Sequence, residues 1–165
     1  MNSIDLIRGN LERSQELVLE KIEDMADHAL VPPTVNGGCH TLWLLGHLAY
    51  IETLLTHSFM KGEPNPHAPW EALFDGDEVS DDPAAYPPFA EVLATCHTRR
   101  AETLSLLDSL CEADLDRVAV GCPAGHERFF GTWRACLQYL ADHWLMHRGQ
   151  LADCRRAAGL HRMWC

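Results

Sequence analysis

The sequence has no run of 18 or more apolar residues and no two cysteines in a Cys-x-x-Cys spacing. The first absence excludes a membrane-spanning helix. The second weighs against zinc knuckles and against thioredoxin-type or rubredoxin-type sites. The seven cysteines are odd in number and widely spread, so we expect free thiols, several of them buried as small apolar residues. The N-terminal segment lacks the uncharged apolar stretch of a signal peptide, and we therefore expect a cytoplasmic protein.

Basic residues are scarce, with 13 Lys and Arg against 24 Asp and Glu and a formal net charge of −11. An acidic protein repels phosphate backbones, so we expect no nucleic-acid partner. The charge is uneven, because residues 71–91 and 112–116 are acidic whereas residues 128–162 contain six arginines. This last segment favours an anionic small-molecule substrate.

Apolar residues recur at helical spacing in four long segments, and no segment shows the sustained alternation of a strand. We therefore expect an all-α protein, a single domain over residues 1–165 built as a four-helix bundle. The expected helices cover residues 4–25, capped by Asn2 or Ser3; 41–60, with Thr41 as N-cap; 88–110, with Pro88 in its first turn; and 132–158, with Thr132 as N-cap and Gly159 as the stop.

The connection between the second and third helices is far longer than a tight antiparallel turn needs. It runs from Gly62 to Pro88 and is rich in Pro, Asp and Gly. One or two turns of helix fit around residues 69–74. A connection of this length can carry the chain along the whole bundle, so the second and third helices can run parallel.

The stretch ADHWLMHRGQLAD, residues 141–153, places His143 and His147 four residues apart on the apolar seam of the fourth helix. Side chains at this spacing lie on one helix face, about 6 Å apart. His47 points inward from the second helix, so three buried imidazoles need partners. A Zn, Ni or Fe ion would supply them and keep positions open for water or substrate. The alternative is three core histidines with polar partners.

Other metal motifs are missing. Trp144 stands where the zincin motif needs Glu, and no histidine has Glu three residues before it, as di-iron bundles require. His40 precedes the expected second helix and is interpreted as a loop residue.

Four residues near the histidines are candidates for a supporting role, and two of them have two interpretations. Glu52 either orients a ligand from outside the ligand set or lies on an exposed helix face. Arg148 either binds a substrate carboxylate or forms a salt bridge to a neighbouring helix. Gln150 can hydrogen-bond metal-bound water, and Gly149 is expected to permit close helix packing.

Two stretches together, GGCHTLWLLGHLAYIE and HWLMHRGQLADCRRAAG, resemble the DinB-like family of metal-binding four-helix bundles. The resemblance implies that His47, His143 and His147 are the metal ligands. It also implies an up-down-down-up bundle with a long crossover between helices 2 and 3, and a homodimer. The chain departs from the usual pattern at Cys39-His40, where a Trp or a similar residue is common.

Better-understood members of this family use the metal to bind a low-molecular-weight thiol, as in bacillithiol- or mycothiol-dependent transferases and maleylpyruvate isomerase. The resemblance therefore implies a thiol-dependent S-transferase or isomerase with a divalent metal, Zn or Ni before Fe, acting on a small molecule. A metal-dependent hydrolase is the first alternative, although no Glu or Asp base is evident near the histidines. A non-catalytic bundle that binds a metal or a small ligand is the second.

Overall fold

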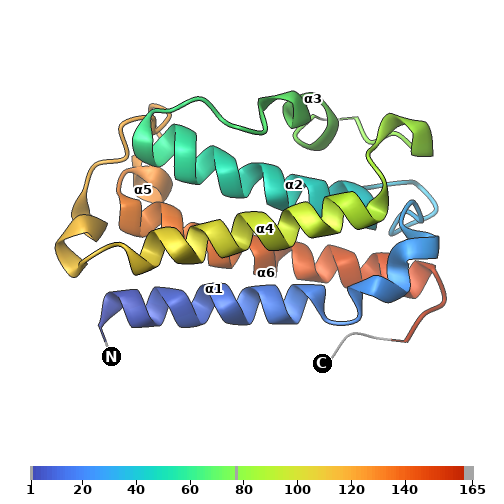
Figure 1. The fold of residues 1–165 in the computed structure, drawn as a ribbon. Helices are drawn as coiled ribbons and strands as arrows, with labels where there is room; N and C mark the ends of the chain where they lie inside the picture. The colour runs from blue at the N-terminus through green and yellow to red at the C-terminus, as the bar shows by residue number, and fades with distance from the viewer. Residues whose placement is uncertain (1, 77, 162–165) are drawn as a thin grey trace.

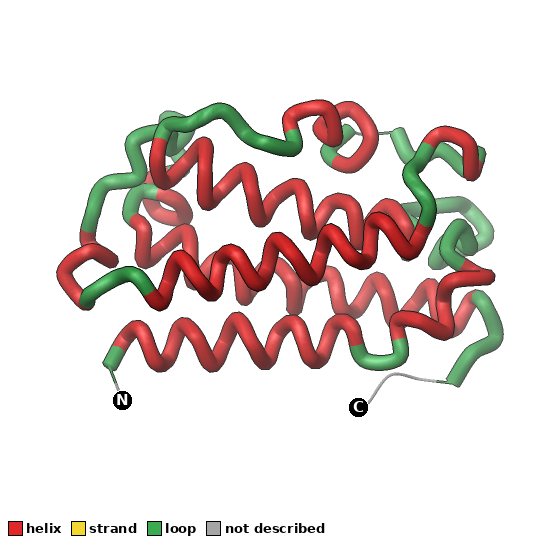
Figure 2. The backbone as a smooth tube through the Cα atoms, viewed as in Figure 1, coloured by secondary structure: helices red, strands yellow, loops and turns green. Residues whose placement is uncertain are grey.

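The computed structural model of the chain describes residues 2–76 and 78–161. These residues form helices joined by loops and contain no β-strand, only two isolated bridges (Figures 1 and 2). The expectation of an all-α protein is confirmed. Within the described ranges, no helix has both the length and the apolar character needed to cross a membrane. The long helices are α1 (Ser3–Leu19), α2 (Thr41–Thr53), α4 (Phe89–Asp108) and α6 (Trp133–Ala157).

These four helices pack side by side along their lengths (Figure 1). Helix α1 lies against α4 and α6, and α2 lies against the same two helices. Each contributes fully buried leucines to a common core, and burying one leucine contributes about 1.5–3 kcal/mol relative to leaving it in water. Packing of apolar faces therefore holds the assembly more than intrinsic helix propensity does. Examples are Leu11, Leu48, Leu107 and Leu140.

The first expected helix, residues 4–25, is interrupted. Helix α1 ends at Leu19, and Lys21 adopts a left-handed conformation with φ of 55°. The chain continues as a short 3-10 helix, η1 (Ile22–His28), that still buries its apolar side chains. The buried guanidinium of Arg155, from α6, donates to the carbonyl of Lys21 at 2.7 Å. The expectation of one continuous helix is wrong, because this tertiary hydrogen bond stabilises the break.

Helix α2 begins with His40 as its N-cap, where the sequence favoured Thr41. Nδ1 of His40 accepts a hydrogen bond from the backbone N–H of Trp43 at 3.1 Å. Nε2 donates to the carbonyl of Ser80 at 2.9 Å. The ring is only 2% exposed, so His40 is a buried cap and not an ordinary loop residue. The imidazole can bridge α2 and the crossover segment, which a threonine side chain is too short to do.

Helix α2 is buried on almost every side. All of residues 41–53 except His47 are buried, as is typical of a helix that is apolar all round. A π-helical segment, η2 (Leu54–Phe59), continues it. This central position makes α2 the element against which both α4 and α6 are placed.

The connection between α2 and α4 folds back onto α2. It contains a 3-10 turn, η3 (Ala68–Trp70), and a single helical turn, α3 (Glu71–Phe74), both packed on α2 (Figure 1). This confirms the turn of helix expected near residues 69–74. A further 3-10 turn, η4 (Pro83–Ala85), precedes Pro88, which was expected in the first turn of the helix and is the N-cap of α4.

Helix α6 agrees with the sequence at both ends. The Thr132 side chain accepts a hydrogen bond from the N–H of Ala135 at 3.2 Å, and Gly159 follows the helix with φ of 73°. The connection from α4 carries η5 (Glu112–Asp116) and the short α5 (Glu127–Phe130). Capping by the Thr132 side chain sets where α6 starts.

The six described cysteines are free thiols, as expected. Cys96, Cys136 and Cys154 are buried, and burial raises the pKa of all three thiols, to about 12 for Cys136 and about 11 for Cys154. These thiols are protonated at neutral pH and act as small apolar groups. Cys165 lies outside the described residues.

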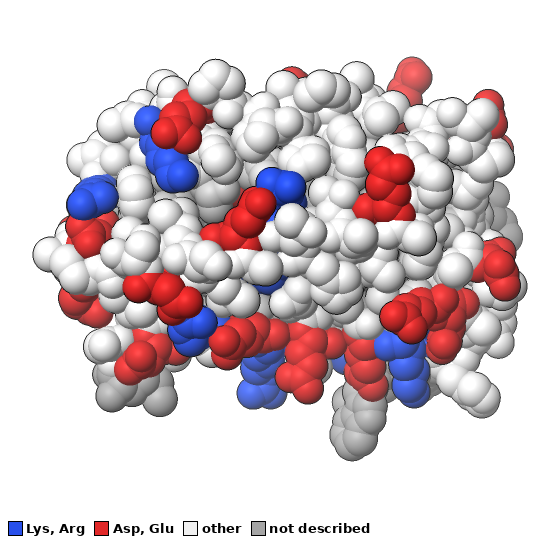
Figure 3. All heavy atoms as spheres, in the orientation of Figure 1, with Lys and Arg blue, Asp and Glu red and all other residues white. Residues whose placement is uncertain are grey.

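Charged side chains of both signs are mixed on the face shown in Figure 3, where they gather mainly over the lower half of the view. Ion pairs such as Arg8–Glu12 at 3.4 Å and Arg99–Glu102 at 2.6 Å join exposed or half-exposed groups. Such pairs contribute little to stability, about 0–1 kcal/mol each. The electrostatic interactions that matter most for stability therefore lie inside the molecule.

Candidate metal centre

Three histidines from two helices meet inside the molecule. His47 comes from α2, and His143 and His147 come from successive turns of α6. Nε2 of His143 lies 3.2 Å from Nε2 of His47 and 3.0 Å from Nε2 of His147. One nitrogen from each ring lies within 4.8 Å of the others. The structure thus brings together the three histidines singled out in the sequence, and together they can bind one metal ion.

All three imidazoles are held in the neutral form. Burial is the largest cause of the lowered pKa in each case. The pKa of His143, which is only 5% exposed, falls to about 2, and that of His47 falls to about 4. The neighbouring imidazoles add to both shifts because two cations cannot lie so close together. Each ring therefore keeps a lone pair at neutral pH, which is the form that binds metals.

Hydrogen bonds at Nδ1 orient two of the rings. Nδ1 of His47 lies 2.7 Å from the carbonyl oxygen of Phe74, and Nδ1 of His147 lies 2.5 Å from Oε1 of Gln150. Because both partners are acceptors, each Nδ1 carries the proton and each Nε2 keeps its lone pair. An acceptor behind a ligating histidine is the usual arrangement in metal sites. The side-chain oxygen of Gln150, a residue expected beside metal-bound water, contacts His147.

The cluster fits a metal ion better than it fits a proton. A single proton on Nε2 of His143 would have to serve two acceptors, the Nε2 atoms of His47 and His147. One cation satisfies all three lone pairs. Two nitrogens bound tetrahedrally to one ion at about 2.0–2.1 Å lie about 3.3 Å apart, close to the spacings of 3.0 and 3.2 Å.

Aromatic and acidic side chains line the histidines. Trp43 stacks on His47 with ring centroids 4.8 Å apart, and Tyr139 stacks on His143 at 5.5 Å. Oδ1 of Asp75 lies 3.6 Å from Nδ1 of His47. Burial, and then the nearby Glu71, raises the pKa of Asp75. From the sequence, Glu52 was named as the acidic residue near the histidines, and Asp75 was missed.

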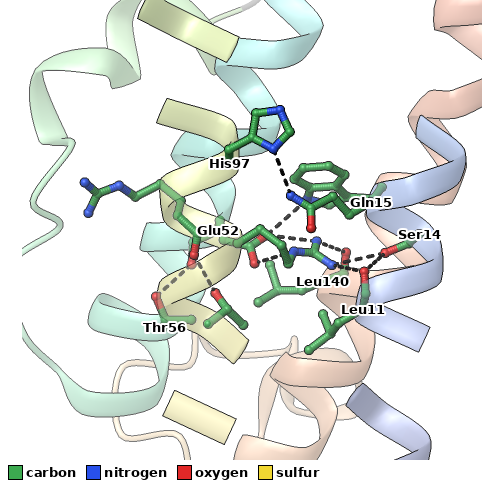
Figure 4. Close-up of polar contacts among 11 residues, drawn as sticks. Leu11, Ser14, Gln15, Glu52, Thr56, His97 and Leu140 are labelled. Carbon is green, nitrogen blue, oxygen red and sulfur yellow. Dashed lines mark hydrogen bonds and ion pairs between the residues drawn. The ribbon is translucent and has the colours of Figure 1, made fainter. Parts of the chain in front are cut away.

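Glu52 is fully buried, and the interpretation of an exposed helix face is wrong. Its carboxylate pairs with Arg100 of α4, with Nε and Oε1 2.9 Å apart, and accepts a hydrogen bond from Nε1 of Trp144 at 3.0 Å. Arg100 also donates to the carbonyl of Leu11 and the hydroxyl of Ser14 (Figure 4). This buried polar cluster joins all four long helices.

The same cluster bears on the histidines through α6. Trp144 directly follows His143, and its ring stacks under the guanidinium of Arg100 at 4.2 Å. Arg100 also donates to the carbonyl of Leu140, one turn earlier. These contacts fix the rotation of α6 at the level of the site, and with it the direction in which His143 points.

Arg148 and Gly149 lie next to His147 in the chain. Nε of Arg148 donates to the carbonyl of Leu17 in α1 at 3.1 Å, so the side chain does reach a neighbouring helix. A Cβ added at Gly149 would meet nothing within 4 Å. The expectation that Gly149 permits close packing is therefore wrong.

A cleft of about 490 Å³ opens elsewhere on the molecule. Apolar and proline side chains line it, among them Leu42, Pro87 and Phe89, and the three histidines are not part of the lining. The convergent donor atoms make the histidine cluster the better candidate for chemistry.

A comparison with known protein families shows to which family the chain belongs. The model of the DinB superfamily matches residues 10–151, a range that contains all three histidines. The chain belongs to the DinB superfamily. Neither the curated proteins nor the solved structures gave a match. Membership of the DinB superfamily agrees with the resemblance carried by the two histidine-containing stretches.

Proposed function

We propose that His47, His143 and His147 hold one divalent transition-metal ion and that the protein is a metal-dependent enzyme. The observation that carries the proposal is the convergence of three neutral Nε2 atoms, two of them oriented by acceptors at Nδ1. The match to the DinB superfamily supports the proposal, because the two histidine-containing stretches of the chain resemble the metal-binding motifs of that family.

The donor set points to the class of metal. Three imidazoles without a thiolate or carboxylate suit Zn²⁺ and Ni²⁺, with Fe²⁺ as a third candidate. Three protein ligands leave at least one position for an outside ligand, whereas a structural zinc takes four side chains. When bound, such an ion supplies Lewis-acid chemistry that lowers the pKa of a thiol or a water molecule, so that a nucleophile is available at neutral pH.

Thiol-dependent S-transfer or isomerisation is the reaction we favour, with a low-molecular-weight thiol as cosubstrate, and it rests on the family resemblance. Residues of the chain keep the ligand rings neutral and oriented through stacking and the bonds at Nδ1. Asp75 approaches the Nδ1 edge of His47, so it acts on that ring and is not placed as a base beside the three Nε2 atoms. This placement favours transfer over hydrolysis.

We also propose that the four long helices form an up-down-down-up bundle. In Figure 1 the colour runs along α1 and α6 in one direction and along α2 and α4 in the other. The folded connection over residues 62–88 supports this arrangement, because parallel neighbours need a connection as long as the bundle.

Cobalt-substituted protein tests the thiol part of the proposal. We expect cysteine or a cysteine-containing low-molecular-weight thiol to produce a sulfur-to-cobalt charge-transfer band in the near ultraviolet. The His57→Ala variant, altered outside the cluster, should show the same band, and His147→Ala should not. If the protein bound cobalt but no thiol produced the band, and if it cleaved esters with water, the proposed transferase activity would be wrong and a hydrolase would be the better assignment.

A further inference from the structure

Gly46, which directly precedes His47, carries no side chain at the point where the crossover segment meets α2. A Cβ added there would lie 2.2 Å from Cδ1 and Cε1 of Phe74 and 2.5 Å from Cγ. These distances are far below van der Waals contact. The Phe74 ring, which is fully buried, therefore occupies a notch that exists only because residue 46 is glycine.

Phe74 also supplies the hydrogen-bond acceptor of His47. Its carbonyl oxygen lies 2.7 Å from Nδ1 of that ring. The ring in the notch and the carbonyl at the histidine belong to one residue at the C-terminal end of α3. A backbone shift of Phe74 that takes the ring away from Gly46 therefore also moves the carbonyl away from His47.

Other aromatic rings hold Phe74 from the crossover side. The centroid of the Trp70 ring lies 4.9 Å from that of Phe74, and the centroid of Tyr86 lies at 5.5 Å. The Tyr86 hydroxyl accepts a hydrogen bond from the N–H of Ser80 at 2.9 Å. Phe74 is thus packed into the crossover, and the contact of its ring with Gly46 joins the crossover to α2 beside His47, as the hydrogen bond between His40 and Ser80 does at the start of that helix.

We propose that the Phe74 ring, seated on Gly46, positions the Phe74 carbonyl on His47, so that docking of α3 on α2 and metal binding are coupled. The inference rests on the proposed metal-binding role of the histidines. Gly46 and Phe74 are positioning residues, since they act through His47. By linkage, whatever loosens α3 weakens metal binding, and a bound metal holds α3 in place by the same factor.

A glycine-to-alanine pair isolates this effect. Gly46→Ala and Gly149→Ala both add a methyl group to a helix that carries a ligand histidine, but only the first meets Phe74. Loss of the acceptor behind a ligating histidine lowers metal affinity about 10-fold or more. Zn²⁺ affinity, measured by competition with a chromogenic chelator, should fall by that factor in Gly46→Ala and stay within about twofold of wild type in Gly149→Ala.

Phe74→Ala provides a second route that introduces no clash, which matters if Gly46→Ala folds poorly. It removes the ring that contacts Gly46 and keeps the backbone carbonyl. The carbonyl is then no longer held on His47 by the ring, so zinc affinity should again fall. The Gly46→Ala/Phe74→Ala double variant should bind zinc no more weakly than Phe74→Ala alone, because both changes remove one contact. Effects that multiply in the double variant would overturn the coupling.

Hydrogen exchange gives a readout that general destabilisation does not mimic. In the wild type, added Zn²⁺ should slow exchange of the backbone amides of α3, and in Gly46→Ala this slowing should disappear while the long helices remain protected. Wild-type zinc affinity in Gly46→Ala and Phe74→Ala would overturn this inference alone. A wild type with no zinc affinity would overturn the proposed function and this inference with it.

Discussion

Burial makes the three clustered histidines neutral, and this prepares them as ligands. His143 is the extreme case, because it is almost fully enclosed and lies between the other two rings. Charging it would place a cation in a poorly solvated space beside two more imidazoles. The same environment that disfavours a proton keeps the lone pairs available to a metal ion.

Acid should destabilise the metal-free protein through these residues. In the unfolded chain each imidazole takes up a proton near its ordinary pKa of 6.5, whereas the folded pKa is about 4 for His47 and about 2 for His143. The unfolded state therefore binds more protons as the pH falls below 6.5. At pH 5 each of these two residues should lower the free energy of unfolding by about 2 kcal/mol relative to neutral pH. Urea unfolding with chelator present measures this.

The matched comparison uses glutamine variants. His47→Gln/His143→Gln should show a shallower loss of stability between pH 7.5 and 5.0, whereas His57→Gln, altered on η2 outside the cluster, should follow the wild type. An identical pH dependence in all three proteins would contradict the assignment of the lowered pKa values.

The sequence predicted that His47, His143 and His147 come together, but not which residues orient their rings. His143 and His147 could be paired because a four-residue spacing puts side chains on one helix face. Phe74 follows His47 by 27 residues, across a segment without periodicity, and contributes a backbone carbonyl. Every residue has such a carbonyl, so no residue type could indicate it. Asp75 was missed because it too lies far from His47 in the chain, beyond a segment without periodicity.

At the level of elements, α2 shows where periodicity stops being informative. A surface helix reveals its outer face by polar residues at regular spacing, but α2 is buried on nearly all sides. The interpretation of Glu52 as a residue on an exposed face of this helix was therefore wrong. Its true environment depends on Arg100 and Trp144 from two other helices, which the sequence of α2 does not contain.

Removing the Glu52 carboxylate should be strongly destabilising. Glu52→Ala leaves the fully buried Arg100 without its counter-charge, which costs about 3–5 kcal/mol in comparable cases. Replacing both partners, as in Glu52→Leu/Arg100→Met, should cost less than Glu52→Ala alone. Urea unfolding of the metal-free proteins measures both.

An exposed ion pair on α4, the helix that carries Arg100, is the control. Glu102→Ala breaks the pair with Arg99 on the outer side of α4 and should cost less than about 1 kcal/mol. Equal losses in Glu52→Ala and Glu102→Ala would mean that burial of the Glu52–Arg100 pair is energetically unimportant.

The ends of the helices were predictable to different degrees. Thr132 and Gly159 bound α6 because a threonine cap and a left-handed glycine are local devices. The break after α1 contains neither glycine nor proline, and it depends on Arg155, which is 134 residues away from Lys21 in the chain. Local sequence carries no trace of such a partner.

At the scale of the whole molecule, a bound metal should stabilise the fold. At a free metal concentration of 100 times Kd, linkage adds about 2.7 kcal/mol. For a chain of this size that corresponds to a rise in Tm of about 5–10 °C. Differential scanning calorimetry with and without chelator should show this difference in the wild type and lose it in His143→Ala. A Tm that changes neither with added metal nor with chelator would contradict metal binding by the folded protein.

The homodimer and the absence of a nucleic-acid partner stay predictions. Multi-angle light scattering of the purified protein at several concentrations checks the first, with twice the chain mass of 18.5 kDa as the expected result. The net charge of −11 leads us to expect no retention on heparin or DNA columns at physiological salt. A monomer at all concentrations, or firm retention, would contradict them.

Metal content of the purified, untagged protein tests the central claim most directly. Elemental analysis should find about one transition-metal ion per chain in the wild type and in His57→Ala, with the metal lost in His47→Ala and His143→Ala. A folded wild type that takes up no Zn²⁺ or Ni²⁺ and does not respond to chelator would contradict the account. It would leave three neutral histidines in the core without a ligand role.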